Sequence, residues 1–224
     1  MAKEILNAIL LAGLFILLFF IAETLYHKFR LRAENTRKIV HVGTGLITML
    51  FPLMLQSGWV VFVLCACFGL SLVLSLRLHL LPSINAIARP SYGSLLYPIA
   101  VYTCFLVYKY FHNNLLFFYL PVLTMALCDP VAALVGRRWP YGRFQLKNGA
   151  KTITGSIAFF ICSVMLTMAL HYFFSEEIFK PAHVFLIALI IAACATATEA
   201  LSTKGVDNIT IPICVVMALI LLHV

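Results

Sequence analysis

The sequence predicts an all-α fold, a polytopic bundle of membrane helices, from its composition and its long apolar runs. Of the 224 residues, 63% are hydrophobic and only 11% are charged, whereas a soluble domain carries about 25% charged residues. A membrane span needs about 20 mostly apolar residues, so the chain supplies about eight spans, within a range of roughly seven to nine. We therefore expect a single integral membrane domain over residues 1–224.

Charges, prolines and glycines divide the apolar sequence into candidate spans. We expect these at residues 5–26, 39–56, 59–78, 93–110, 115–136, 153–174, 181–202 and 209–224. No small-residue cleavage site follows the charged start of the chain, so we interpret the first segment as a retained span rather than a signal peptide. The 7 cysteines show neither disulfide-framework nor zinc-ligand spacing.

The basic residues are distributed unequally between the two sides of this arrangement. Of the 16 Lys and Arg residues, only Lys3, Lys109 and Lys180 lie on the same side as the two termini. The positive-inside rule therefore places the other connections in the cytoplasm and the N-terminus outside. A basic cytoplasmic face suits anionic lipids and explains the net charge of +8 without a nucleic-acid partner. The cytoplasmic cations are Lys28, Arg30, Arg32, Arg37, Lys38, Arg77, Arg89, Arg137, Arg138, Arg143, Lys147, Lys151 and Lys204.

Asp129 lies inside an apolar run and is followed by Pro130. An acidic residue at membrane depth is unfavourable, so it calls for a partner or a function. Asp followed by Pro is typical of a helix start, with Asp as N-cap. We therefore expect the fifth span to be broken here, which is tolerated only where the break lines a polar cavity. The alternative is an aspartate that only caps a kinked helix or pairs with a neighbouring arginine.

The stretch from Lys147 to Ser156 leads into the sixth span and combines two cations, two glycines and three hydroxyls. Free backbone N–H groups at such a helix start favour phosphate, and Lys151 adds a positive charge. Gly155 lets a ligand or another helix approach closely. The stretch is not a P-loop, because Ala150 precedes Lys151 and no strand is expected before it. An interfacial lysine beside a capping Thr152 is the alternative.

Arg37, Lys38 and His41 open the second span and lie within one helical turn of each other. Their spacing allows all three to face one cavity. Gly43 and Gly45 follow, and such small residues permit close helix packing or leave room for a ligand. The alternative for His41 is an ordinary interfacial histidine.

Glu199, Asp207 and Asn208 lie within ten residues of one another at the end of the seventh span. Oxygen ligands of this kind suit Mg²⁺, which binds one or two carboxylates together with substrate phosphates. Asp207 and Asn208 could equally be turn residues, with Gly205 supplying the bend.

These four groups are all expected on the cytoplasmic side. Carboxylates for a metal, cations and a helix start for phosphates, and surrounding lipid-accessible helices together indicate an enzyme that moves a phosphoryl or nucleotidyl group to or from a lipid. Phosphoryl transfer needs positioning and charge neutralisation more than covalent chemistry, which fits this set of residues.

Four motifs in this order resemble the family of dolichol kinase, phytol kinase and CTP-dependent diacylglycerol kinase, which is related to phosphatidate cytidylyltransferases. The resemblance covers residues 35 to 212. Cys128 and Pro130 depart from the family pattern, as does Thr154, which stands where relatives often carry Glu. The motifs are Arg37-Lys38-x-x-His41, Asp129-x-x-Ala132-Ala133-x-x-Gly136-Arg137, Lys151-Thr152-x-x-Gly155-Ser156 and Glu199-Ala-x-Ser202-x-x-Gly205-x-Asp207-Asn208-x-x-x-Pro212.

The resemblance implies a lipid-alcohol kinase that passes the γ-phosphoryl of CTP or ATP to a polyprenol, a phytol-like prenol or diacylglycerol. It implies Mg²⁺ held by Asp129 with Asp207, Asn208 or Glu199 assisting. One of Asp129, Glu199, Asp207 and His41 would take the hydroxyl proton, and the nucleotide is expected to contact Arg37, Lys38, Arg137, Lys151, Thr152, Gly155, Ser156 and Asn208.

Two other functions fit parts of this pattern. A phosphatidate cytidylyltransferase would use a similar site but release pyrophosphate, whereas a transporter or structural membrane protein would use its charges only to line a polar pathway. The clustering of acids on one side argues against the pathway. We expect a bacterial inner membrane rather than the endoplasmic reticulum, and the sequence indicates no oligomeric state.

Overall fold

The structure is a computed structural model that describes residues 2–86, 91–146, 149–174 and 180–222. Arg89 and Lys147, two of the cations expected in the cytoplasm, lie outside these ranges. The elements in chain order are α1 (Ala2–His27), α2 (Ala33–Thr48), α3 (Phe51–Met54), α4 (Gly58–Arg77), α5 (Pro82–Asn85), α6 (Gly93–Tyr110), α7 (Leu116–Leu123), the π-helical turn η1 (Thr124–Cys128), α8 (Asp129–Arg138), β1 (Arg143–Leu146), β2 (Gly149–Thr152), α9 (Ile153–Phe174), α10 (Pro181–Leu201) and α11 (Asp207–Leu221).

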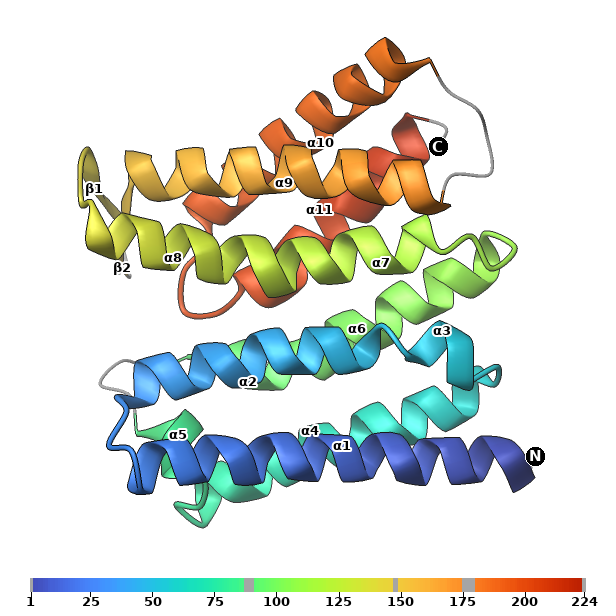
Figure 1. The fold of residues 1–224 in the computed structure, drawn as a ribbon, viewed down its shortest axis with the longest axis vertical. Helices are drawn as coiled ribbons and strands as arrows, with labels where there is room; N and C mark the ends of the chain where they lie inside the picture. The colour runs from blue at the N-terminus through green and yellow to red at the C-terminus, as the bar shows by residue number, and fades with distance from the viewer. Residues whose placement is uncertain (1, 87–90, 147–148, 175–179, 223–224) are drawn as a thin grey trace.

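The helices form a bundle with the small hairpin at one end (Figure 1). α1 packs against α2, α4 and α5, and α4 packs against α6. α9 packs against α8 and α10, while α11 contacts both α10 and α6. The start of α1 and the end of α11 lie at the end of the bundle opposite the hairpin (Figure 1), as an even number of passes requires.

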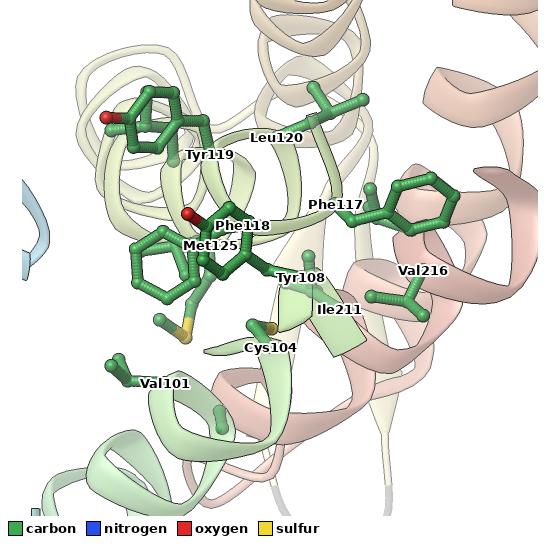
Figure 2. Close-up of a cluster of buried hydrophobic side chains, with 14 of the residues drawn as sticks. Val101, Cys104, Tyr108, Phe117, Phe118, Tyr119, Leu120, Met125, Ile211 and Val216 are labelled. Carbon is green, nitrogen blue, oxygen red and sulfur yellow. The ribbon is translucent and has the colours of Figure 1, made fainter. Parts of the chain in front are cut away.

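The continuous helix made of α7, η1 and α8 forms the centre of this bundle. Protein buries 67% of its most apolar window, compared with 17% for α1 and for α4. Figure 2 shows the core where this helix meets α6 and α11, with Phe117 and Phe118 packed near Tyr108 and Val216. A helix that is apolar on all sides but only partly covered by protein faces lipid. We therefore treat α1 and α4 as lipid-facing helices.

Five helices in the described part of the chain are long and apolar enough to cross a membrane. They are Ala2–His27, Gly58–Arg77, Leu116–Arg138, Ile153–Phe174 and Pro181–Leu201. The three other expected spans also contain helices, namely α2 with α3, α6 and α11. The predicted all-α membrane bundle is thus confirmed, while the number of spans, their orientation and the single-domain boundary stay predictions.

The connection before α9 differs from what the sequence predicted. No strand was expected before Lys151, yet β1 and β2 form an antiparallel hairpin in which Phe144 lies opposite Lys151. The Ile153 amide donates to the Gly142 carbonyl at 3.2 Å, so the hairpin leads directly into α9. β1 alternates polar and apolar residues over only four positions, Arg143 to Leu146, and β2, Gly149 to Thr152, has no such alternation, so neither strand gives a clear signal in sequence. Lys151 lies in a strand and not in a glycine-rich loop, so a P-loop is still excluded.

Candidate active site

A cavity of about 590 Å³ lies at the hairpin end of the bundle. Six elements contribute to its polar wall, and every residue that the sequence singled out for a site lies on it. The structure therefore brings all four motifs together, while the chemical role of each residue stays a prediction. These wall residues are Arg37, Lys38, His41, Asp129, Arg137, Lys151, Thr152, Gly155, Ser156, Glu199, Asp207 and Asn208.

Asp129 reaches this wall from a helix that is not broken. The sequence predicted a break with Asp129 as N-cap, but the helix is continuous from Leu116 to Arg138, and α8 begins without a side-chain cap. The prediction was wrong because the wider π-helical turn η1 comes just before Asp129. Pro130 cannot donate a backbone hydrogen bond. The wider hydrogen-bond pattern of the π-helical turn lets the helix continue past it.

The Asp129 carboxylate has no hydrogen bond or ion pair with any other residue that the structure describes. It therefore neither caps a kinked helix nor pairs with an arginine, the two structural alternatives for it. His41 lies beside it on the wall, with its Nε2 3.1 Å from the Met125 carbonyl oxygen. The Tyr97 hydroxyl donates to the His41 carbonyl at 3.2 Å and fixes that turn of α2.

Lys151 lies between two carboxylates on another part of the wall. Its Nζ forms an ion pair with Glu199 Oε1 and lies 4.0 Å from Asp207 Oδ2. Burial lowers the pKa of the Lys151 ammonium, but the Glu199, Asp129 and Asp207 carboxylates more than offset this effect and leave that pKa above its ordinary value. The second oxygen of Glu199 is buried without a hydrogen bond.

The start of α9 is held by hydroxyls. Thr152 Oγ1 accepts a hydrogen bond from the Gly155 amide at 3.1 Å, so the capping threonine considered as an alternative is present. The Thr154 hydroxyl donates to the Trp139 carbonyl and ties α9 to the end of α8. Gly136 and Gly155 face each other where these helices cross. A Cβ on Gly136 would lie against Gly155 and would collide with Thr152 Oγ1. The small size of Gly155 thus serves helix packing.

Two donors on the wall have no hydrogen-bond partner. The Lys38 ammonium nitrogen and the Ser156 hydroxyl are both buried and unpaired among the described residues. Buried polar groups in native proteins are nearly always paired with protein, water or a ligand. A cation and a hydroxyl that share one cavity favour an anionic group such as a phosphate.

The loop between α10 and α11 packs against the start of α6. Asn208 Nδ2 donates to the Gly93 carbonyl at 2.8 Å, and the Tyr92 amide donates to the Lys204 carbonyl at 2.8 Å. Gly205 has a φ of +82°, and a Cβ on it would collide with the Gly93 backbone, while a Cβ on Gly93 would collide with Asn208 Nδ2. One N–H of the Asn208 side-chain amide therefore anchors this loop, while its Oδ1 makes no hydrogen bond with the described residues.

Sequence reasoning missed two parts of the cavity. Ser91 accepts a hydrogen bond from Arg37 at 3.2 Å, and nothing near Ser91 in the sequence resembles a motif. Apolar side chains from α1, α2, α4 and α5 form the other side of the cavity. In a membrane span an apolar residue that lines a cavity looks the same as one that faces lipid, so no sequence signal could have separated them. The apolar side includes Phe19, Val40, Phe68, Leu72 and Ile84.

The carboxylates on the wall fit a Mg²⁺ ion that is shared with a phosphate. Among the described residues no group of three or more His, Cys, Asp or Glu side chains is arranged to hold a metal ion alone. Mg²⁺ does not require such a group, since one or two carboxylates and substrate phosphates suffice. The unpaired, buried Glu199 Oε2 beside Asp207 is the observation that supports this fit.

Comparison with known proteins gives the family. The chain is 34% identical over 183 residues to the phytol kinase of the cyanobacterium Synechocystis, covering 81% of this chain and 76% of that protein. The chain belongs to the phytol kinase family. It is also 27% identical over 236 residues to a probable chloroplastic phytol kinase 2 of rice, covering 95% of this chain and 74% of that protein. No protein-family model matches the chain, and no solved structure matches it.

Membership of this family confirms the resemblance seen in the four motifs. A membrane protein of a prenol kinase family also agrees with the apolar helices around the cavity.

Proposed function

We propose that this protein is a lipid-alcohol kinase that transfers the γ-phosphoryl of CTP, or of ATP, to the hydroxyl of a prenol such as phytol. The observation that carries the proposal is the composition of one cavity. Unpaired cationic and hydroxyl donors, four carboxylates (Glu34, Asp129, Glu199 and Asp207) and an apolar side all line it. The similarity to proteins named phytol kinase supports a prenol as acceptor rather than diacylglycerol or a long polyprenol.

The nucleotide would bind along the basic part of the wall. Lys38 and Ser156 supply unpaired buried donors, and Arg37 is already oriented by Ser91 at 3.2 Å. Lys151 would neutralise further negative charge when phosphates displace Glu199 from it. The exposed Arg137 lies at the rim of the same cavity and would contact the outer part of the nucleotide. Cationic contacts of this kind stabilise the charge on a transferring phosphoryl group.

Asp207 and Glu199 would hold Mg²⁺ together with the phosphate oxygens. When bound, the ion neutralises charge on the β- and γ-phosphates. Asn208 Nδ2 donates to the Gly93 carbonyl, which keeps the start of α11 and Asp207 in place, and its Oδ1 would assist the carboxylates at the ion.

Asp129 would accept the proton of the acceptor hydroxyl. It is unpaired, whereas Glu199 is engaged by Lys151 and His41 Nε2 is bonded to Met125. The acceptor oxygen forms a bond to the γ-phosphorus, and the bond from that phosphorus to the β,γ-bridging oxygen breaks. The nucleoside diphosphate leaves, and the hydroxyl proton passes to the Asp129 carboxylate. General-base assistance of this type contributes about 10²- to 10⁴-fold in rate.

The proposal is tested by following labelled phosphate into lipid. The purified protein is incubated in detergent with Mg²⁺, with CTP or ATP labelled at the α- or γ-phosphate, and with prenols, diacylglycerol or phosphatidic acid. We expect lipid label from the γ-position and prenol as acceptor. Label from the α-position in phosphatidic acid would instead establish a cytidylyltransferase. Absence of label from both positions would favour a transporter or structural protein.

We further propose that the protein lies in a bacterial inner membrane and that the cavity opens on the cytoplasmic side. The support is the excess of Lys and Arg in the connections at this end of the bundle and the similarity to a cyanobacterial protein. A single cysteine placed in the hairpin of a variant without the seven natural cysteines should resist a membrane-impermeant maleimide in intact spheroplasts. Labelling of intact spheroplasts would reverse the orientation.

A further inference from the structure

A second, smaller void lies beyond the apolar side of the cavity. It measures about 10 Å³ and is lined by residues of α1, α2, α3, α4 and α6. Phe15, Phe51, Cys65 and Val101 are among its lining residues, so it is mostly apolar. A void of this size holds at most about one water molecule, and apolar voids stay dry.

The two spaces are neighbours because three side chains line both. Thr44, Phe68 and Tyr97 each contribute to the wall of the cavity and to the wall of the void. The aromatic rings show how they are separated. Phe68 stacks on Phe19 with a centroid distance of 5.5 Å and packs on Phe15 at 4.9 Å.

Phe19 lines only the cavity and Phe15 lines only the void. Phe68 lies between these two rings and separates the cavity from the void. Together the two spaces define one apolar path that the Phe68 ring divides. The path begins at the polar wall, beside His41, and runs between α1, α2 and α4 away from the hairpin end.

We propose that the hydrocarbon chain of the acceptor alcohol occupies the apolar side of the cavity and that Phe68 sets the longest chain that fits. This inference rests on the proposed function, because it takes the acceptor to be a prenol. A prenol has one polar atom at the end of a long apolar chain. The cavity has the same order of surfaces, with carboxylates and cations at one end and Val40, Leu72 and Ile84 at the other.

The energetic basis is the fit of methylene and methyl groups against the apolar side of the cavity. The chain enters from lipid, which is as apolar as the cavity, so fit rather than transfer from water decides which chains bind; a rigid apolar wall discriminates chain lengths by about 10- to 200-fold per excluded group. Phe68 can act as such a wall because Phe15, which supports it, is only 5% exposed. Removing the Phe68 ring would join the cavity to the void.

The test measures kcat/KM for a series of acceptors of increasing length: geraniol, farnesol, phytol and solanesol. We expect Phe68→Ala to raise the ratio of kcat/KM for solanesol to that for farnesol at least about tenfold. Phe62→Ala is the matched control, because Phe62 lies on the same helix, is 43% exposed and lines neither space. That control should keep the wild-type ratio.

A second variant fills the path instead of opening it. Leu72→Trp places a larger side chain on the apolar side, and we expect it to raise KM for phytol about tenfold or more without changing KM for the nucleotide. Geraniol, which needs less of the path, should be affected least. A milder opening, Phe68→Leu, with an unchanged elution volume and nucleotide KM, distinguishes altered specificity from misfolding.

The outcomes separate this inference from the proposed function. Phosphorylation of prenols with the same chain-length profile in wild type, Phe68→Ala, Phe68→Leu and Leu72→Trp would overturn the inference and leave the kinase intact. Absence of prenol phosphorylation by the wild type would instead remove the proposed function. In that case a diazirine-bearing farnesol that labels the cavity-lining Phe19 or Leu72, with excess phytol competing, would still support the apolar path, and labelling confined to residues outside the cavity would reject it.

Discussion

The Nε2 atom of His41 on α2 lies 3.1 Å from the carbonyl oxygen of Met125 in the π-helical turn η1. A carbonyl only accepts hydrogen bonds, so this nitrogen carries the proton and donates it. In the i→i+5 pattern of a π-helix the Met125 carbonyl would be bonded by the amide of residue 130. Residue 130 is Pro130, which has no N–H. His41 thus replaces a missing backbone donor directly before Asp129.

We predict that His41 positions Asp129 and does not take the acceptor proton. In His41→Ala the Met125 carbonyl would be left unbonded, which costs about 1–3 kcal/mol and allows the turn before Asp129 to shift. We expect kcat to fall about 10- to 100-fold with little change in nucleotide KM, measured with phytol and CTP.

His41→Gln is the matching variant because its side-chain amide can still donate to Met125. It should recover most of the activity and keep the wild-type pH dependence of kcat. If it were as inactive as His41→Ala in a folded preparation, the imidazole itself would be part of the chemistry.

The polar wall could be predicted from sequence because charged side chains are unfavourable in lipid and therefore gather in the bundle interior or in a polar cavity. Asp129, Lys151 and Glu199 each interrupt or border an apolar run, and grouping them on one membrane face needed only the positive-inside rule. The predicted break at Asp129 was wrong because the Asp-Pro pair indicates a helix start from local sequence alone, without regard to distant contacts. The helix stays continuous there beside His41, which bonds the Met125 carbonyl from 84 residues away in the chain.

Other features depend on contacts that leave no local pattern. Gly205 could be recognised as a bend, but its contact with Gly93 joins two distant segments. The partition at Phe68 is equally hidden, since Phe62 on the same helix is an identical residue that faces outward at 43% exposure. Apolar periodicity identifies helix faces against water, and in lipid that contrast disappears.

We predict that Asp129→Asn lowers turnover at least about 100-fold. Asparagine has nearly the same shape but accepts a proton far less readily, and Asp129 makes no hydrogen bond that the change would break within the described residues. Thermal unfolding in detergent should therefore match the wild type. Turnover near the wild-type value in a folded Asp129→Asn preparation would remove Asp129 from the mechanism.

The Lys151–Glu199 ion pair should respond differently to single and double substitutions. The side chains are 22% and 4% exposed, respectively, so removing one partner leaves a largely buried charge. We expect Lys151→Met to reduce stability by about 3 kcal/mol, measured by thermal unfolding in detergent. Activity should also be lost, because Lys151 neutralises phosphate charge in the proposed site.

The double variant Lys151→Met/Glu199→Gln separates the two effects. Without the Glu199 charge part of the lost stability should return, although Asp207, 4.0 Å from Lys151 Nζ in the wild type, still lacks its cation; activity should stay lost. A double variant as unstable as Lys151→Met would show that the lysine stem, rather than its charge, holds this region together.

Gly205→Ala should weaken the site through the backbone. Gly205 has a φ of +82°, a conformation that adds about 1–3 kcal/mol for other residues, and a Cβ there would collide with Gly93. We expect lower thermal stability and a raised KM for the nucleotide, because Asp207 and Asn208 follow directly. Gly13→Ala is the control, since nothing lies within 4 Å of its Cβ position in α1, and it should be neutral or stabilise the helix by up to about 1 kcal/mol. Equal effects of the two substitutions would mean that the contact between Gly205 and Gly93 does not hold Asp207 in place.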